Sequence, residues 1–376
     1  MSADRPSAET QALHHRIDNA ATHPLATPIY QNSAFTADSP YFYTRKSNPN
    51  SVELEGALAL FEKAAHVISV TTGMAAVSLM LQQLRPGDAL VVNKDIYGCS
   101  YKLFQRYAQQ FNLKLSIVDL STPSGRAEIP RDVAMVVFET PTNPFLKTIP
   151  IREVADRAKA ANPAALVVVD NTWATPLFQN PLELGADATV ASATKYFSGH
   201  SDVMGGVVAV NDDALAEALR QTRFYCGSIL DPNSAWLLRR SLHTFPLRMR
   251  QHVRVTAVLH EFLQTRAEVA AVYFPAIDAL QLRDYGGILF IQLQPGLSAH
   301  YPRFVEALSL FDTGTGMACV TSMVAQPWSG SHASLSDAEK REMQLNEGLV
   351  RLCFGLEEPA DLIADLTRAF AALRDA

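Results

Sequence analysis

Short, continuously apolar runs alternate with helical stretches over the first two thirds of the chain. The apolar runs occupy residues 89–92, 114–118, 134–138, 165–169, 188–191 and 206–210. The helical stretches between them occupy residues 74–84, 99–110, 151–161 and 212–223. Strands that are apolar on both faces need cover on both faces, and strands joined by helices pair in parallel. The pattern therefore predicts an α/β domain: a mostly parallel sheet with helices on both faces.

The rest of the chain has a different organisation. After a helical stretch expected at 234–266, we predict strands near 269–273, 287–293 and 349–353, and helices near 300–309, 336–347 and 359–372. This order is typical of a smaller C-terminal α+β domain. The first forty or so residues are polar and contain several prolines, which indicates an extended arm. We therefore expect an arm at 1–44, a large domain at 45–245 and a C-terminal domain at 246–376.

Composition excludes several classes of protein. Of the 376 residues 48% are hydrophobic, and the net charge is −6. No block of basic residues mixed with aromatics suggests nucleic-acid binding, and no apolar run is long enough for a membrane span. The polar N-terminus does not resemble a signal peptide, and the four cysteines form no CxxC pair. We expect a reduced, cytoplasmic protein with no nucleic-acid, membrane or metal partner.

An acid and a lysine follow two consecutive apolar runs. Asp170 comes after the run that ends at Val169, and Lys195 comes shortly after the next run. In an open parallel sheet, ligands bind outside the carboxyl ends of the strands. This pair suits pyridoxal 5'-phosphate (PLP), which needs a lysine to hold it covalently and a carboxylate to pair with its pyridine nitrogen.

Each residue alone also has an ordinary explanation. An aspartate at a strand end is often a helix cap, and a lysine there is usually a solvated side chain. Ser192 and Thr194 favour the cofactor, because hydroxyls beside the lysine can donate hydrogen bonds to a phosphate.

Three further segments could contribute to such a site. The sequence TTGMAA, with Gly73 and Met74, opens a predicted helix, whose free N–H groups favour a phosphate. Tyr97 follows an apolar run and could lie flat on an aromatic ring. Tyr43 and Arg45 end the arm, where an arginine is either a surface residue or a bidentate phosphate ligand.

Seven segments in order along the chain resemble those of one enzyme family. They are YTRKSNPN, TTGMAA, YGCS, ETPTNP, VDNTWATP, SATKYFSGHSD and EGLVRLCFGLEE. The sequence is similar to the PLP-dependent enzymes of cysteine and methionine metabolism, which include cystathionine γ-synthases, cystathionine and methionine lyases and homoserine sulfhydrylases. The resemblance runs from about residue 26 to the C-terminus. It implies a fold-type I PLP enzyme whose dimers pair into homotetramers.

The resemblance also implies roles in cofactor binding. Lys195 would bind PLP covalently and move protons, and Asp170 would pair with the pyridine nitrogen. The phosphate would be held within the same subunit by the group Gly73, Met74, Ser192 and Thr194.

The other implied roles concern the substrate and the neighbouring subunit. Tyr97 would stack on the cofactor ring and act as an acid or base at the leaving group, and Arg351 would bind the substrate α-carboxylate. Tyr43 and Arg45 would reach the phosphate of the neighbouring subunit. Two residues would lie around the cofactor without touching the substrate: Glu139 and Asn143.

One segment departs from the family pattern. Where the family has a Ser-Leu-Gly-x-x-Glu-Ser stretch, residues 316–322 read GMACVTS, without the first serine and the glutamate. Just before it, Thr315 aligns with a glutamate of cystathionine-cleaving γ-lyases. We therefore expect a preference for an amino acid with a neutral γ-substituent over cystathionine. Trp173 resembles a residue of some bacterial β-lyases, although packing in the core is the simpler interpretation.

Three functions remain open on the sequence. The main prediction is a lyase that releases a thiol or other leaving group, ammonia and a 2-oxo acid from a sulfur-containing or γ-substituted amino acid. The alternative is γ-replacement on an O-acylhomoserine. A PLP-binding scaffold without catalysis is the third possibility, suggested by the altered 316–322 segment.

Overall fold

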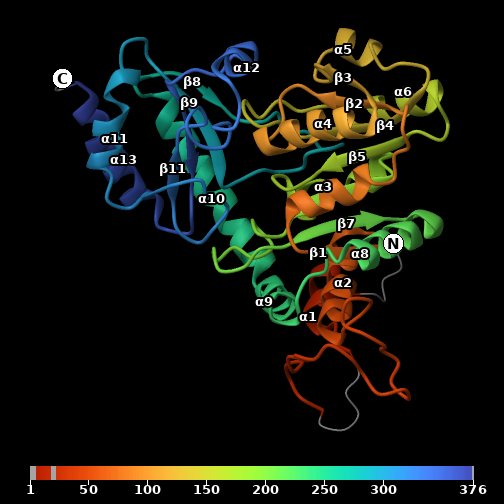
Figure 1. Ribbon diagram of the computed structural model, residues 1–376. Coiled ribbons are helices and arrows are strands. Elements are labelled where there is room, and N and C mark those ends of the chain that lie inside the picture. Colours follow the sequence, from red (N-terminus) through yellow and green to blue (C-terminus); the bar gives the residue numbers. More distant parts are fainter. Residues whose placement is uncertain (1–5, 18–22, 375–376) are drawn as a thin grey trace.

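The first sheet forms the centre of the larger domain. The computed structural model describes residues 6–17 and 23–374. The strands of this sheet are β1 (His66–Val70), β2 (Ala89–Asn93), β3 (Lys114–Val118), β4 (Val133–Glu139), β5 (Leu166–Asp170), β6 (Ala188–Ser192) and β7 (Gly206–Val210). Their order is β1-β7-β6-β5-β4-β2-β3 (Figure 1). Only β7 is antiparallel to its neighbours, so the predicted mostly parallel sheet is confirmed. Strand β1 was not predicted, because its sequence HVISV is interrupted by polar residues.

Helices cover both faces of this sheet, as expected. The helices of this domain are α2 (Pro49–Glu62), α3 (Gly73–Leu81), α4 (Gly98–Phe111), α5 (Pro123–Ala127), α6 (Ile151–Ala161), α7 (Thr175–Phe178), the 3₁₀ turn η1 (Pro181–Leu184) and α8 (Asp213–Cys226). Buried side chains of α3, α4 and α8 pack on one face, and those of α2 and α6 pack on the other. Alternate residues of a strand point to opposite faces, so each strand contributes to both cores.

The second sheet belongs to the C-terminal part of the chain. Its strands, in spatial order, are β10 (Asp312–Thr313), β11 (Met323–Ala325), β12 (Leu349–Cys353), β9 (Ile288–Leu293) and β8 (Val269–Tyr273). The short strands β10 and β11 were not predicted. The helices here are α10 (Phe245–Gln264), η2 (Ser298–His300), α11 (Tyr301–Ala307), α12 (Asp337–Glu342) and α13 (Pro359–Arg374). Of these, α10, α11 and α13 bury apolar residues against one face of the sheet, which confirms a second, smaller α+β unit.

Two expectations about helices were wrong. The stretch 234–266 is not one helix: α9 (Pro232–Leu242) ends before α10 begins at Phe245. Pro246 explains the break, because proline has no backbone N–H to donate and is tolerated in the first turn of a helix. The N-terminal arm is also not entirely extended, since α1 (Ala8–His14) packs against α2.

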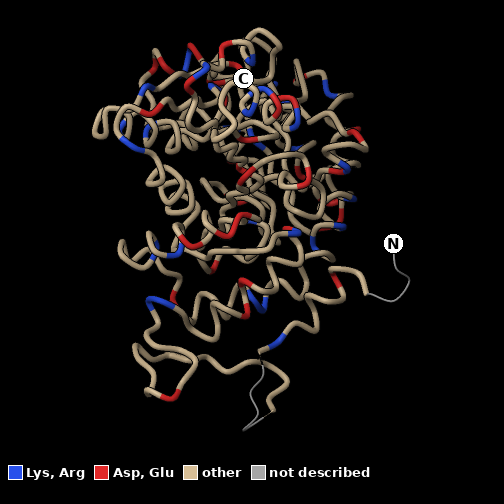
Figure 2. Tube along the Cα trace, turned by 90° about the vertical axis from the view of Figure 1, so that its right-hand side faces the viewer, with Lys and Arg blue, Asp and Glu red and all other residues tan. Residues whose placement is uncertain are grey.

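The surface carries both signs of charge. Figure 2 shows Lys and Arg mixed with Asp and Glu along the trace, without one sign dominating a whole side. Within residues 6–17 and 23–374, no helix is long and apolar enough to cross a membrane.

Candidate active site

The carboxyl ends of four neighbouring strands form one rim of the large sheet. Strands β6, β5, β4 and β2 are adjacent in that order and parallel. Three predicted site residues end these strands: Ser192, Asp170 and Glu139. The others follow the strand ends: Thr194, Lys195, Asn143 and Tyr97. The parallel arrangement thus brings together segments that are up to about a hundred residues apart in the sequence, as the sequence pattern predicted.

The N-terminus of α3 packs directly against the end of β6. A Cβ atom on Gly73 would lie 2.7 Å from the Ser192 Cβ, so only glycine allows this approach. Thr72 caps α3 by accepting a hydrogen bond from the Ala75 N–H at 3.0 Å. The sulfur of Met74 accepts a hydrogen bond from the Ser100 hydroxyl at 3.6 Å. The free N–H groups of the first turn of α3 therefore face the segment that contains Ser192 and Lys195.

Lys195 lies at the wall of a cavity of about 620 Å³. The cavity is lined by Thr71, Thr72, Thr194, Lys195, Ser201, Asp202, Val203, Met204, Leu230, Asp231, Ser234, Gly316 and Met317. Among the described residues, none forms a hydrogen bond or ion pair with Nζ of Lys195. Burial, followed by the charge of Arg351, lowers the pKa of the Lys195 amine. A lysine in this environment is easier to deprotonate and hence more nucleophilic than one on the surface.

Asp170 is held by a hydroxyl that sequence reasoning did not identify. Its Oδ1 accepts hydrogen bonds from the N–H and the hydroxyl of Thr172, at 3.0 and 2.6 Å. The Thr172 hydroxyl in turn accepts a hydrogen bond from the Ser192 N–H at 2.9 Å. Thr172 therefore joins the ends of β5 and β6. Burial raises the pKa of Asp170, and the two Thr172 hydrogen bonds oppose that change.

Glu139 and Asn143 belong to the neighbouring strand end. Glu139 is buried and faces Asp170 across the β4–β5 pair. Burial first, and the Asp170 carboxylate second, raise the pKa of Glu139 well above its usual value. Asn143 is also buried, and its Oδ1 has no hydrogen-bond partner in the described structure.

Tyr97 stands at the N-terminus of α4, where its position is fixed through the backbone. Its N–H donates to Glu139 Oε2 at 3.1 Å, and its side chain is 37% exposed. Burial, with smaller contributions that include Cys99, raises the pKa of Tyr97 to about 12, although Arg351 opposes this. The phenol is therefore protonated at neutral pH and suited to donate a proton.

Arg351 reaches the site from the second sheet. On β12, Val350 and Leu352 are buried against the C-terminal helices. Because successive side chains of a strand point to opposite faces, Arg351 points to the other face of the sheet. Its Nη2 donates to the carbonyls of Thr315 and Gly316, at 3.2 and 2.9 Å. Its Nε is buried without a partner. The unusual 316–322 segment thus contacts the arginine through the Gly316 carbonyl and the Met317 sulfur and does not replace it.

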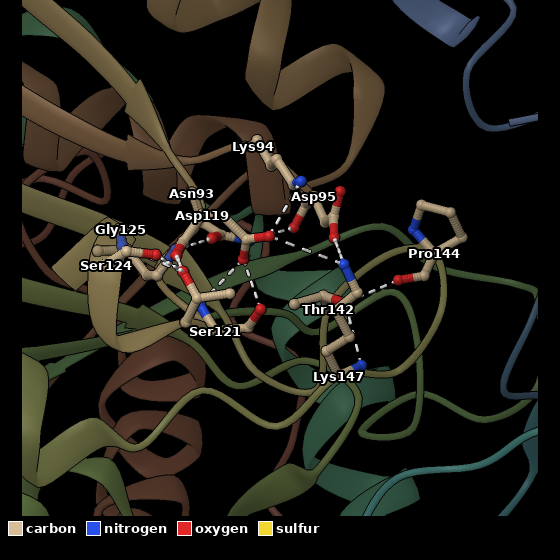
Figure 3. A network of polar contacts seen from close by, with 12 residues as sticks. Asn93, Lys94, Asp95, Asp119, Ser121, Ser124, Gly125, Thr142, Pro144 and Lys147 are labelled. Atoms are coloured by element: carbon tan, nitrogen blue, oxygen red, sulfur yellow. Dashed lines mark hydrogen bonds and ion pairs between the residues drawn. The ribbon is translucent and has the colours of Figure 1, made fainter. Parts of the chain in front are cut away.

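Ion pairs join the segments that follow strands β2, β3 and β4 (Figure 3). Lys147 donates to the buried Asp95 at 2.7 Å, and Lys94 pairs with Asp119 at 2.9 Å. The first pair ties the loop that carries Asn143 to the segment between β2 and Tyr97. Sequence reasoning missed this network, because charged residues after strands are usually solvated.

Tyr43 and Arg45 are not in this cavity. Arg45 Nη1 donates to the Phe224 carbonyl at 3.0 Å, and its guanidinium lies 4.4 Å from the centre of the Phe224 ring. Tyr43 is partly exposed on the arm beside it. The sequence expectation placed them at another subunit's site, which a single chain does not test.

A family comparison decides what kind of site this is. The model of the Cys/Met metabolism PLP-dependent enzymes matches residues 9–371. The chain is a member of this family. Its relatives include an L-methionine γ-lyase of Pseudomonas deceptionensis, 35% identical over 97% of both chains. A cystathionine β-lyase of Coxiella burnetii is 34% identical over 96% of this chain and 97% of its own.

Solved structures agree with the family assignment. The cystathionine γ-synthase of Xanthomonas oryzae pv. oryzae, in complex with aminoacrylate and cysteine, superposes with a TM-score of 0.95 at 34% identity, covering 99% of both chains. The cystathionine γ-lyase of Lactobacillus plantarum, complexed with L-serine, gives a TM-score of 0.93 at 30% identity, covering 98% of this chain and 100% of that one. The predicted fold and the predicted PLP cofactor are thereby confirmed.

The residues at the rim fit PLP. The unpartnered amine of Lys195 suits the reactive carbon of the cofactor, and the Asp170 carboxylate on the adjacent strand suits its pyridine nitrogen. The N-terminus of α3, beside Ser192, suits its phosphate. Trp173, in contrast, is buried and stacks on Phe290 of the second sheet at 5.9 Å, which agrees with the packing interpretation.

Proposed function

We propose that this chain is a PLP-dependent lyase that eliminates a neutral γ-substituent from an α-amino acid. The observation that carries the proposal is the placement of Lys195 on the same rim as Asp170, with Arg351 close enough to lower the pKa of the lysine. Membership of the family supports the reaction class, since its members that resemble this chain include methionine γ-lyases and cystathionine lyases.

Each residue has a role that follows from its position. PLP, when bound, withdraws the electron pair left on the substrate Cα after its proton leaves. Lys195 would hold the cofactor and then, once displaced by the substrate, carry protons at Cα and Cβ. Asp170 would pair with the pyridine nitrogen. The phosphate would be bound by the first turn of α3, at Gly73 and Met74, and by Ser192 and Thr194.

Substrate contacts come from both sheets. Arg351 would bind the α-carboxylate, because its buried Nε–H is a hydrogen-bond donor that has no acceptor in the described structure. Tyr97, protonated at neutral pH, would donate a proton to the leaving group. Glu139 would hold Tyr97 in place through the backbone hydrogen bond described above.

The preference for a neutral γ-substituent rests on the charges nearby. Thr315 replaces the acid that would pair with a distal ammonium, and burying an ammonium without a partner costs several kcal/mol. Lys102 donates to both carboxylate oxygens of Glu339, at 2.7 and 2.8 Å. Ser336 also donates to Glu339, so this carboxylate is committed and does not offer a site for a distal ammonium.

The test is product analysis with a matched panel of substrates. Methionine, homocysteine or an O-acylhomoserine should give 2-oxobutyrate at a higher kcat/KM than cystathionine, measured through a coupled dehydrogenase. A clear preference for cystathionine would contradict the pocket argument. Pyruvate from cystathionine would show β-elimination in its place.

A second candidate is γ-replacement. It is favoured by the similarity to the cystathionine γ-synthase of Xanthomonas oryzae. Adding cysteine to a reaction with an O-acylhomoserine separates the two: formation of cystathionine at the expense of 2-oxobutyrate would indicate the transferase.

A further inference from the structure

A second cavity lies between the N-terminal arm, α2 and α9, and it shares no lining residue with the cavity at Lys195. Its volume is about 170 Å³. These elements lie together at the lower end of the molecule in Figure 1. The cavity is lined by Arg16, Leu25, Ala26, Thr27, Asn50, Glu53, Trp236, Arg239, Arg240 and His243. None of these residues takes part in the proposed reaction.

Among the described residues that line this cavity, the charges do not balance. Three arginines, Arg16, Arg239 and Arg240, face one carboxylate, Glu53. Glu53 is already committed: it pairs with Arg239 Nε at 3.2 Å and accepts a hydrogen bond from the Thr27 hydroxyl. Within the described chain, the exposed side chains of Arg16 and Arg240 have no hydrogen-bond or ion-pair partner.

Arg239 is buried with part of its hydrogen-bonding capacity unused. The residue is 5% exposed. Its Nη2 donates to the carbonyls of Ala12 and His15, at 2.9 and 2.7 Å, which ties it to the arm. Its Nη1, in contrast, is buried with no partner in the described structure. Leaving a buried charged donor unpaired is costly. Because Arg239 lines the cavity, an anion there would offset part of its charge.

We propose that this cavity binds a small tetrahedral oxyanion of the sulfate or phosphate class. With His243 neutral, the described lining residues comprise three guanidinium groups and one carboxylate, an excess of two positive charges that a dianion neutralises. Guanidinium groups bind such oxygens through paired N–H groups. The volume is below the roughly 300–1,000 Å³ of pockets for drug-sized ligands, so a small ion fits better than a nucleotide.

The bound anion would fasten the arm to the body of the domain. Arg16 and Thr27 belong to the arm, whereas Arg239 and Arg240 belong to α9. The arm continues to Tyr43 and Arg45, the residues proposed above for the neighbouring site. Occupancy of the cavity would therefore stabilise the part of the chain from which those two residues extend.

The test is equilibrium dialysis of the PLP-loaded enzyme against radiolabelled sulfate and, separately, phosphate. The loaded enzyme is required because free cofactor cavities would also bind these ions at the phosphate position. We expect saturable binding of one ion per chain. Arg240→Gln and Arg16→Gln should each weaken it by roughly tenfold to a hundredfold, as expected for the loss of a charged hydrogen bond. Arg239 is unsuitable for this test, because it also holds the arm.

The controls separate this site from general charge effects. Arg254→Gln removes an exposed arginine of α10 that pairs with Glu358, so binding should be unchanged. Retained PLP absorbance and circular dichroism would verify that each variant is folded. Absence of saturable binding in the assembled enzyme, equal binding by all variants, or binding of malonate but not of sulfate or phosphate would each overturn the proposal. These results do not depend on which amino acid the enzyme cleaves.

Discussion

At the scale of single residues, two side chains of the same type can differ in reactivity because their surroundings differ. Lys195 has no partner and a lowered pKa, whereas Lys94, at the same rim, is paired with Asp119. Both are lysines a few residues after a strand end. Only the first offers an amine that is free to react, because ion pairing keeps the second protonated.

This contrast gives a direct prediction for cofactor attachment. Borohydride treatment of the purified enzyme should fix PLP on Lys195, and peptide mass mapping should locate the adduct. Lys195→Ala should abolish the adduct, while Lys94→Ala, the matched variant at the same rim, should retain it. Recovery of the adduct on another lysine of the wild-type enzyme would contradict the assignment.

Tyr97 leads to a kinetic prediction. Tyr97→Phe keeps the ring but removes the proton donor, so PLP affinity should be retained while kcat falls roughly a hundredfold to ten-thousandfold. Tyr101→Phe, one turn further along α4, should leave kcat unchanged. Steady-state kinetics and cofactor titration measure both effects. If Tyr97→Phe turns over at the normal rate, the acid must be another group, and Lys195 is the first to examine.

At the scale of elements, the site depends on how closely α3 approaches β6. Gly73 permits contact with Ser192, and Thr72 caps the helix whose N–H groups face the rim. The helix N-terminus can act on a phosphate only at this short range, since the effect of its dipole is confined to the first turn.

Gly73→Ala tests that approach. The added Cβ would lie 2.7 Å from the Ser192 Cβ, so α3 and β6 must separate. Overpacking of this kind costs typically 1–3 kcal/mol, so PLP should bind roughly tenfold more weakly or worse. Met74→Leu keeps both volume and backbone N–H and should bind PLP normally. Titration of the apoenzymes with PLP would show equal affinities if this contact is unimportant.

At the scale of the whole molecule, the two sheets and the arm have separate roles. The large sheet provides the rim, the second sheet provides Arg351, and the arm carries Tyr43 and Arg45 away from their own chain's cavity. We propose that the arm serves the site of a neighbouring subunit, within the homotetramer that the family resemblance implies.

Mixed dimers test this arrangement. Neither Arg45→Ala nor Lys195→Ala homodimers should be fully active. A heterodimer of the two contains one site with both residues intact, so mixing should restore part of the activity, up to half of the sites in each heterodimer. The mixture should be compared with each variant alone at equal subunit concentration. If heterodimers form, as shown by differently tagged subunits, without any recovery, the shared-site model is wrong.

The sequence alone predicted six of the seven strands of the large sheet, the rim and the cofactor. Apolar runs of four or five residues between helical stretches indicate strands of a covered sheet, and the ends of parallel strands meet at one edge, which brought Asp170 and Lys195 together. The ordered motifs then identified the family, including Arg351, whose role no local pattern could reveal.

The tertiary structure decided what depends on contacts between distant segments. Thr172 bridges two strand ends, and Arg351 is held by the carbonyls of residues 315–316. The unpartnered Nη1 of Arg239 and its cavity depend on how the arm packs against α9. These features escape sequence reasoning because hydrogen-bond partners and burial are set by packing, while periodicity reports only which face of an element is apolar.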